Sequence, residues 1–129
     1  MPPPSTRITS GIDLIEIERI ARAVDRWGDR FLHRVYTDTE IAHCRGRAQS
    51  LAGRFAAKEA ASKALGIGIR GLSWHDIETV RGPRGKPVMR LHGKASRIAS
   101  AQGLTSFEVS ITHSRTEALA VVIAWGVPA

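Results

Sequence analysis

Residues 53–66, GRFAAKEAASKALG, are rich in alanine, with a few charged residues set among small ones. Alanine is the strongest helix former, and a glycine such as Gly66 commonly ends a helix. The sequence therefore predicts a long helix over 48–65. Its small side chains leave other groups room to approach, and Glu59 stands in its middle, directly after Lys58.

The spacing around Glu59 allows two interpretations. Glu59 precedes Lys63 by four residues, an orientation that gives an ion pair on a helix surface, worth only a few tenths of a kcal/mol. Alternatively, Ala52 and Ala56, its neighbours on the helical wheel, allow a bulky group to approach. Glu59 would then meet a metal ion or a substrate. Spacing alone leaves both interpretations open.

A second carboxylate lies upstream, within the apolar, β-branched residues 8–15, which predict a buried strand. Asp13 interrupts this strand, and a buried carboxylate is costly unless it is paired, hydrogen-bonded or metal-bound. The alternative is an aspartate that reaches solvent at the strand end or caps the next helix. Two carboxylates together with water and substrate phosphates commonly hold Mg²⁺. Asp13 and Glu59 could supply that pair, and nearby lysines could hold phosphate oxygens.

Composition narrows the function classes. The chain has 129 residues, 43% of them hydrophobic, which fits one domain with a real core. No apolar run approaches the ~20 residues of a membrane-spanning helix. Residues 1–6 are expected to be a tail without a secretory signal. Cys44 is the single cysteine, which excludes an internal disulfide and a CxxC metal site and favours a reducing, cytoplasmic location.

The charge balance points to an anionic partner. The net charge of +7 and the pI near 10.7 suit nucleic acid, a phosphorylated small molecule or an acidic protein. The few aromatic residues are not interleaved with basic ones, which disfavours a stacking platform for single strands. Binding of a duplex through its phosphates stays open.

The remaining pattern predicts a mixed α+β domain with antiparallel strand pairs. Thr37 and Glu40 form a capping-box pattern that starts a helix ending near Gly46. Residues 31–36 are helical or irregular, and 66–73 form a glycine-rich loop. The expected order is β-α-α-α-β-β-α-β-β, with strands at 8–15, 74–82, 88–93, 106–113 and 117–125 and helices at 16–27, 37–46, 48–65 and 94–102.

Other candidate residues each have an ordinary alternative. One face of the helix expected at 16–27 carries Arg19, Arg22 and Arg26. This face is either simply solvated or a docking ridge for an acidic partner. His113 ends a strand just before a turn and could equally be a surface or core histidine. The glycines of the 66–73 loop are not followed by a GK[ST] motif, so they form no P-loop. The remaining histidines lack metal-site spacing and are expected at the surface: His33, His43, His75 and His92.

Three blocks of the chain, in this order, resemble the holo-acyl-carrier-protein synthases, small bacterial 4′-phosphopantetheinyl transferases. The most specific block is LAGRFAAKEAASKALG at 51–66; the others are GIDLIEIERI at 11–20 and VSITHSRTEALAVVIA at 109–124. The resemblance runs from about Ile8 to Ala124. It implies a phosphopantetheinyl transferase fold, in which an antiparallel sheet packs against a long central helix. It also implies transfer of 4′-phosphopantetheine from coenzyme A to a serine of an acyl-carrier protein, a step of fatty acid biosynthesis that releases adenosine 3′,5′-bisphosphate.

The resemblance also implies roles for individual residues. Asp13 and Glu59 match the ligands of a Mg²⁺ that bridges the coenzyme A pyrophosphate. Glu59, directly or through a metal-bound water, is the expected base for the serine proton. Lys63 matches a catalytic lysine on the phosphates, and Arg54 and His113 match positions near them, with the segment 66–71, including Gly66, near the nucleotide.

The resemblance further implies partners. Arg19, Arg22 and Arg26 match a basic helix that meets the acidic carrier protein, and family members are homotrimers whose active sites are shared between subunits. Ser10, Ala61 and Ile67 depart from common family residues, without touching a proposed metal ligand. The competing interpretations are a small basic nucleic-acid-binding module, which needs neither carboxylate, and a Mg²⁺-dependent phosphohydrolase, which does not need the arginine face.

Overall fold

A computed structural model describes residues 6–127. The tail expected at 1–6 therefore lies outside the described residues except for exposed Thr6. Along the chain the elements are β1 (Arg7–Glu16), α1 (Ile17–Trp27), α2 (Asp29–Val35), α3 (Asp38–Cys44), α4 (Ala48–Ala64), β2 (Ile77–Arg81), β3 (Pro87–Leu91), α5 (Gly93–Ala101), β4 (Ser106–His113) and β5 (Glu117–Gly126), with single 3₁₀ turns at Ile69–Gly71, Trp74–Asp76 and Pro83–Gly85.

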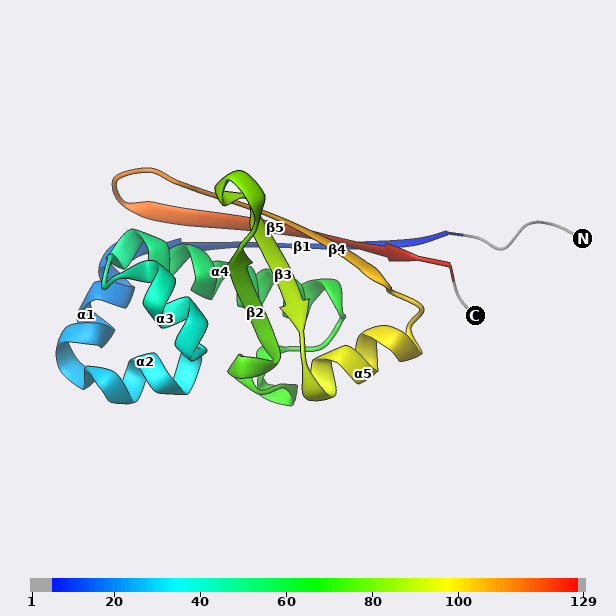
Figure 1. Cartoon of the computed structure of the whole chain (residues 1–129), viewed down its shortest axis with the longest axis horizontal. Helices are drawn as coiled ribbons and strands as arrows, with labels where there is room; N and C mark the ends of the chain where they lie inside the picture. The colour runs from blue at the N-terminus through cyan, green and yellow to red at the C-terminus, as the bar shows by residue number, and fades with distance from the viewer. Residues whose placement is uncertain (1–5, 128–129) are drawn as a thin grey trace, which may run out of the picture.

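Three long strands form an antiparallel sheet in the order β1-β5-β4, and β2 pairs with β3 in a separate hairpin. The sheet runs along one side of the molecule, with the helices on its other side (Figure 1). In the same view the β2-β3 hairpin crosses the direction of the long strands. The expected α+β class, with an antiparallel sheet packed against a long helix, is confirmed.

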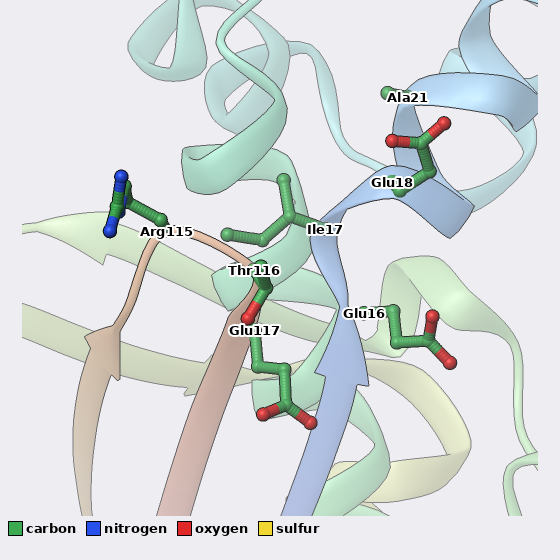
Figure 2. A pocket seen from close by; sticks show the side chains of 7 residues that line it. All are labelled: Glu16, Ile17, Glu18, Ala21, Arg115, Thr116 and Glu117. Carbon is green, nitrogen blue, oxygen red and sulfur yellow. The ribbon is translucent and has the colours of Figure 1, made fainter.

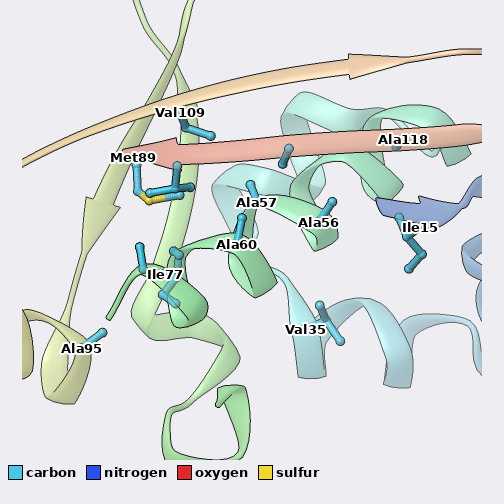
Figure 3. Packing of buried hydrophobic residues seen from close by; sticks show 14 of the residues in the cluster. Ile15, Val35, Ala56, Ala57, Ala60, Ile77, Met89, Ala95, Val109 and Ala118 are labelled. Carbon is cyan, nitrogen blue, oxygen red and sulfur yellow. The ribbon is translucent and has the colours of Figure 1, made fainter. Parts of the chain in front are cut away.

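Helix α4 is the centre of the core. Ala52, Ala56 and Ala60 are fully buried, and Figure 3 shows Ala56, Ala57 and Ala60 of α4 on the helix side of the long sheet. The contact with β1 is very close, since a Cβ added to Gly11 would lie 1.8 Å from the carbonyl oxygen of Ala60. The sequence predicted that the space beside these small side chains would admit a bulky group. The protein's own sheet occupies that space instead, because its backbone packs directly against α4.

Lys58 is also fully buried, which the sequence pattern did not predict. Its Nζ donates to Glu40 Oε1 at 2.8 Å, to the carbonyl of Trp74 at 3.0 Å and to the carbonyl of Ile77. Glu40 Oε2 accepts from the backbone N–H of Thr79 at 3.0 Å. Burial lowers the pKa of Lys58, and the Glu40 carboxylate opposes that shift. This pair ties α4 to α3 and to β2.

The local predictions were largely correct, apart from differences at some element ends and one added helix. The strand expected over 88–93 ends at Leu91, because Gly93 already belongs to α5. The Thr37–Glu40 capping box is present with both of its hydrogen bonds, but α3 ends at Cys44, with Arg45 in the left-handed region before Gly46. The ambiguous segment near Phe31 is helical and adds α2, so four helices precede β2 rather than three. The strand expected over 74–82 begins only at Ile77, after a 3₁₀ turn.

The outer face of the long sheet is apolar and uncovered in the described part of the chain. Its side chains alternate with inward-facing ones along β1 and β5, as a pleated strand requires. Ile8 is 68% exposed, Ile12 and Leu14 are each 57% exposed, and Ile123 is 43% exposed. An apolar face of this kind usually marks an interface.

Candidate active site

Four charged side chains meet in an open depression where β1, α1 and α4 come together. Its volume is about 290 Å³, and the apolar residues Leu14, Ile15 and Phe55 complete its lining. The charged residues are Asp13 from β1, Arg19 from α1, and Glu59 and Lys63 from α4. The structure therefore brings together both carboxylates and the lysine predicted from the sequence, plus one arginine of the predicted ridge.

The close contact between β1 and α4 positions this group. Gly11 faces Ala60 on the inner side of β1, and Asp13 follows two residues later on the same side, because side chains alternate along a strand. Glu59 directly precedes Ala60 on the helix. Asp13 thus lies in the middle of β1, away from the strand end. It does not cap α1, whose N-cap residue Glu16 makes no side-chain cap bond.

Lys63 spans from α4 to β1. Its Nζ donates to the backbone carbonyl of Ile12 at 2.9 Å and to Asp13 Oδ1 at 3.2 Å. Among the described residues Lys63 pairs with Asp13 and makes no ion pair with Glu59. The surface pair Glu59–Lys63, one of the two interpretations of this spacing, is therefore wrong. Glu59 instead presents its carboxylate to the depression.

The surroundings of Glu59 favour its protonated form. Burial raises the pKa of Glu59 above its usual value of 4.5, and the nearby Asp13 carboxylate raises it further, while Lys63 and Arg19 act in the opposite direction. Two carboxylates beside each other in a partly dehydrated site resist simultaneous ionisation. A carboxylate in this environment is suited to accept a proton or to bind a cation.

The donor set fits Mg²⁺ better than a structural metal. Mg²⁺ is typically held by one or two carboxylates, with water and substrate phosphates filling its other positions. Asp13 and Glu59 provide two carboxylates in an open site. Over residues 6–127 no group of three or more His, Cys, Asp or Glu side chains could hold a metal ion. A closed, tetrahedral zinc site would need such a group.

Other predicted residues lie elsewhere on the chain. Arg54 lies beside Cys44, where burial raises the pKa of the thiol and the Arg54 charge partly offsets that shift. Arg54 Nε is buried and has no hydrogen-bond partner within the described residues. His113 lines a separate depression of about 450 Å³ with Gln49 and Arg115. Gly66 follows the end of α4 and is not part of the carboxylate depression.

Arg19, Arg22 and Arg26 are all exposed on α1, as the helical spacing predicted. Arg26 stacks over the Trp27 ring, 5.0 Å from its centroid. The sequence missed the depression next to this face, because it forms only where α2 turns back against α1. Its lining residues are Trp27, Arg30, Phe31 and Arg34.

An acidic depression next to the His113 site was also missed. Glu16, Glu18 and Glu117 line it together with Arg115, as Figure 2 shows. Glu16 and Glu117 lie opposite each other in the β1-β5 pairing. Like charges placed directly across a strand pair destabilise it. Only the strand register brings them together, so the sequence contains no local signal for this cluster.

The family model described as "4′-phosphopantetheinyl transferase superfamily" matches residues 10–122. The holo-[acyl-carrier-protein] synthase of Herpetosiphon aurantiacus is 48% identical over 126 residues, covering 92% of this chain and 99% of the relative. That of Koribacter versatilis is 48% identical over 118 residues, covering 88% and 94%. A crystal structure of the Helicobacter pylori enzyme in complex with coenzyme A superimposes with a TM-score of 0.82 at 37% identity, covering 89% of this chain and 98% of that one.

Proposed function

The chain belongs to the 4′-phosphopantetheinyl transferase superfamily, among the holo-[acyl-carrier-protein] synthases, and we propose that Asp13, Glu59 and Lys63 form its reacting centre. It is an enzyme that transfers 4′-phosphopantetheine from coenzyme A to a serine of an acyl-carrier protein. The observation that supports this centre is the meeting of the three side chains, from β1 and α4, in one open depression.

Asp13 and Glu59 would hold Mg²⁺. When bound, the ion would polarise the pyrophosphate of coenzyme A and orient it for attack. The support is the open pair of carboxylates, which leaves positions free for water and phosphate. Arg19, on the rim of the same depression, adds a positive charge beside the place where the phosphates would lie.

Residues of the chain can accept the proton of the serine hydroxyl and offset the charge that develops on the phosphates. The serine oxygen forms a bond to the β-phosphorus of coenzyme A, and adenosine 3′,5′-bisphosphate leaves. Glu59, with its raised pKa, accepts the proton of the serine hydroxyl. Lys63 has a half-exposed side chain, so its ammonium can turn from Asp13 toward the phosphates and offset the charge that develops there.

One assay tests this function. The protein is incubated with coenzyme A, Mg²⁺ and an apo acyl-carrier protein, and mass spectrometry measures the mass of the carrier. We expect a carrier heavier by one phosphopantetheine group and release of adenosine 3′,5′-bisphosphate. An unmodified carrier with hydrolysed coenzyme A would instead indicate a phosphohydrolase. No reaction together with tight, salt-sensitive binding of nucleic acid would indicate a binding module.

The acidic carrier protein would dock on Arg19, Arg22 and Arg26. All three arginines are exposed, and within the described residues none forms a salt bridge with a carboxylate. Because Arg19 also lines the carboxylate depression, a carrier on this face would bring its serine close to the reacting centre. The double substitution Arg19→Glu with Arg26→Glu should raise KM for the carrier far more than KM for coenzyme A. An equal rise in both constants would contradict docking at this face.

The enzyme would be a homotrimer with coenzyme A bound between subunits. One chain keeps Arg54 and His113 away from the carboxylate depression, so a neighbouring copy would have to supply them. The uncovered apolar face of the long sheet, which includes Ile8, Ile12 and Leu14, offers the surface for that copy. Sedimentation velocity should give a trimer. A monomer at concentrations that support full activity would contradict the shared site.

We place the enzyme in the cytoplasm. Its single cysteine, Cys44, is buried and free, which suits a reducing compartment. Within the described residues, no helix has the length and apolar character that crossing a membrane requires. Fractionation of cells that produce the protein at native levels would test this location.

A further inference from the structure

Lys63 pairs with Asp13, one of the two proposed metal ligands. Its Nζ lies 3.2 Å from Asp13 Oδ1 and 2.9 Å from the carbonyl oxygen of Ile12. The Asp13 side chain is only 19% exposed, whereas that of Lys63 is 53% exposed. The lysine therefore covers one of the two carboxylates from the solvent side.

The depression is also balanced in charge without a metal. Two carboxylates, Asp13 and Glu59, share it with two basic side chains, Lys63 and Arg19, and the rest of the lining is apolar. A divalent cation that entered alone would meet two positive charges in a partly dehydrated site, where repulsion is screened less than in water. A divalent cation that entered with a pyrophosphate would bring its own negative charge, and the balance would be kept.

Lys63 is able to leave Asp13, in contrast to the other lysine of the same helix. Lys58 is fully buried and donates to three acceptors, so it has no donor left for a ligand. Lys63 has two acceptors, and its flexible side chain is half exposed. It can exchange a carboxylate for a phosphate at little cost.

We propose that Lys63 is an internal counter-ion that weakens binding of the bare metal and so couples metal binding to coenzyme binding. This inference rests on the proposed assignment of Asp13 and Glu59 as metal ligands. When the pyrophosphate arrives, Lys63 transfers from Asp13 to a phosphate oxygen and frees the carboxylate. Coupling of this kind is reciprocal, so the metal strengthens coenzyme binding by the same factor as the coenzyme strengthens metal binding.

The test measures binding in the absence of carrier protein, so that no turnover occurs. Mn²⁺, which prefers the same oxygen ligands as Mg²⁺, is titrated into the full-length protein and followed by its electron paramagnetic resonance signal. Each titration is made with and without saturating coenzyme A, and a protein-free titration corrects for Mn²⁺ held by coenzyme A alone. Calorimetric titration of coenzyme A with and without Mn²⁺ gives the reciprocal factor.

In the wild type, coenzyme A should tighten Mn²⁺ binding by about tenfold or more, within the usual range of coupling between sites. Lys63→Met should bind Mn²⁺ alone about tenfold more tightly than the wild type does, and coenzyme A should then tighten Mn²⁺ binding by a smaller factor than in the wild type. Lys63→Gln, which keeps a polar side chain, should behave in the same way. Lys94→Met removes the same charge from exposed Lys94 on α5 and should leave both affinities unchanged.

Two outcomes would overturn the inference. If Lys63→Met binds Mn²⁺ alone as weakly as the wild type does, with its coupling to coenzyme A intact, Lys63 is not a counter-ion. If Lys94→Met has the same effect as Lys63→Met, only the overall charge of the protein matters. Failure of the metal site itself is recognised separately, because Asp13→Asn would then leave Mn²⁺ binding in the presence of coenzyme A unchanged.

Discussion

Lys58 and Glu59 are neighbours in the chain but lie in opposite environments. Lys58 is fully buried between α4, α3 and β2, and every one of its donors has an acceptor. Glu59 lines an open depression with Asp13 and Lys63. Adjacent residues on a helix point about 100° apart, so the same short motif, Lys-Glu, contributes one residue to the core and the next to the site.

The contrast shows that hydrogen-bond occupancy, and not charge alone, separates a structural ion pair from a functional one. In the Lys58–Glu40 pair the charges and their donors are satisfied inside the protein. Removing one partner would leave a buried charge alone, which is strongly destabilising. In the Lys63–Asp13 pair the lysine is half exposed, so its removal costs little stability. Mutations should therefore separate stability from activity along this helix.

The largest effect is expected on the open side, in the rate of transfer. Glu59→Gln and Asp13→Asn each keep the size of the side chain but remove its charge. Each should lower kcat by about 10²–10⁴-fold, the usual contribution of a positioned proton acceptor, with the loss of metal affinity adding to it. Turnover near the wild-type rate with saturating substrates, in protein whose circular dichroism spectrum is unchanged, would refute the assignment.

The next effect is expected on the buried side, in stability. Lys58→Met leaves the Glu40 carboxylate buried without its partner, and the free energy of unfolding should fall by about 3–5 kcal/mol. Lys63→Met, on the same helix, should change it by less than about 1 kcal/mol. Urea unfolding of the two variants side by side measures the difference. Similar losses in both would mean that the two pairs do not differ as described.

A third substitution, Gly11→Ala, should lower both the stability of the fold and the rate of transfer. Gly11→Ala would place a Cβ 1.8 Å from the carbonyl oxygen of Ala60, so α4 must shift away from β1. Overpacking of this kind typically costs about 1–3 kcal/mol, and kcat should fall as well because Asp13 moves relative to Glu59. Gly68→Ala is the matched control for stability, since a Cβ there meets no atom within 4 Å. A stable, active Gly11→Ala enzyme would show that the contact between β1 and α4 does not position the site.

The smallest effect is expected on Tm, because ionised Glu59 in the depression lowers the stability of the fold. Burial and Asp13 raise the pKa of Glu59 above 4.5, so ionised Glu59 destabilises the fold, and its cost grows as the pH rises through the raised value. Glu59→Gln should therefore increase Tm by about 1–3 °C at pH 7, while the two proteins should melt together near pH 4. Scanning calorimetry without divalent cations measures both. A lower Tm for Glu59→Gln at pH 7 would mean that Glu59 stabilises the fold.

Local signals in the sequence predicted most elements of the fold. The Thr37–Glu40 capping box depends on residues three apart, and both of its hydrogen bonds are present. The alanine-rich stretch predicted α4 almost to its ends, since helix propensity is summed over neighbours. The short helix α2 stayed ambiguous, because its seven residues are too few for helical periodicity to distinguish it from an irregular segment.

The sequence by itself determined that Asp13 and Glu59 are unusual, because a carboxylate in an apolar strand and one in an alanine helix each require a reason. Only the tertiary structure decided that Lys63 pairs with Asp13, that Lys58 belongs to the core, and that Arg54 lies outside the depression. The reason is physical. Helix and strand patterns are set by neighbours along the chain, whereas burial and ion pairing depend on which elements pack together, and here a glycine on β1 lets the strand approach α4.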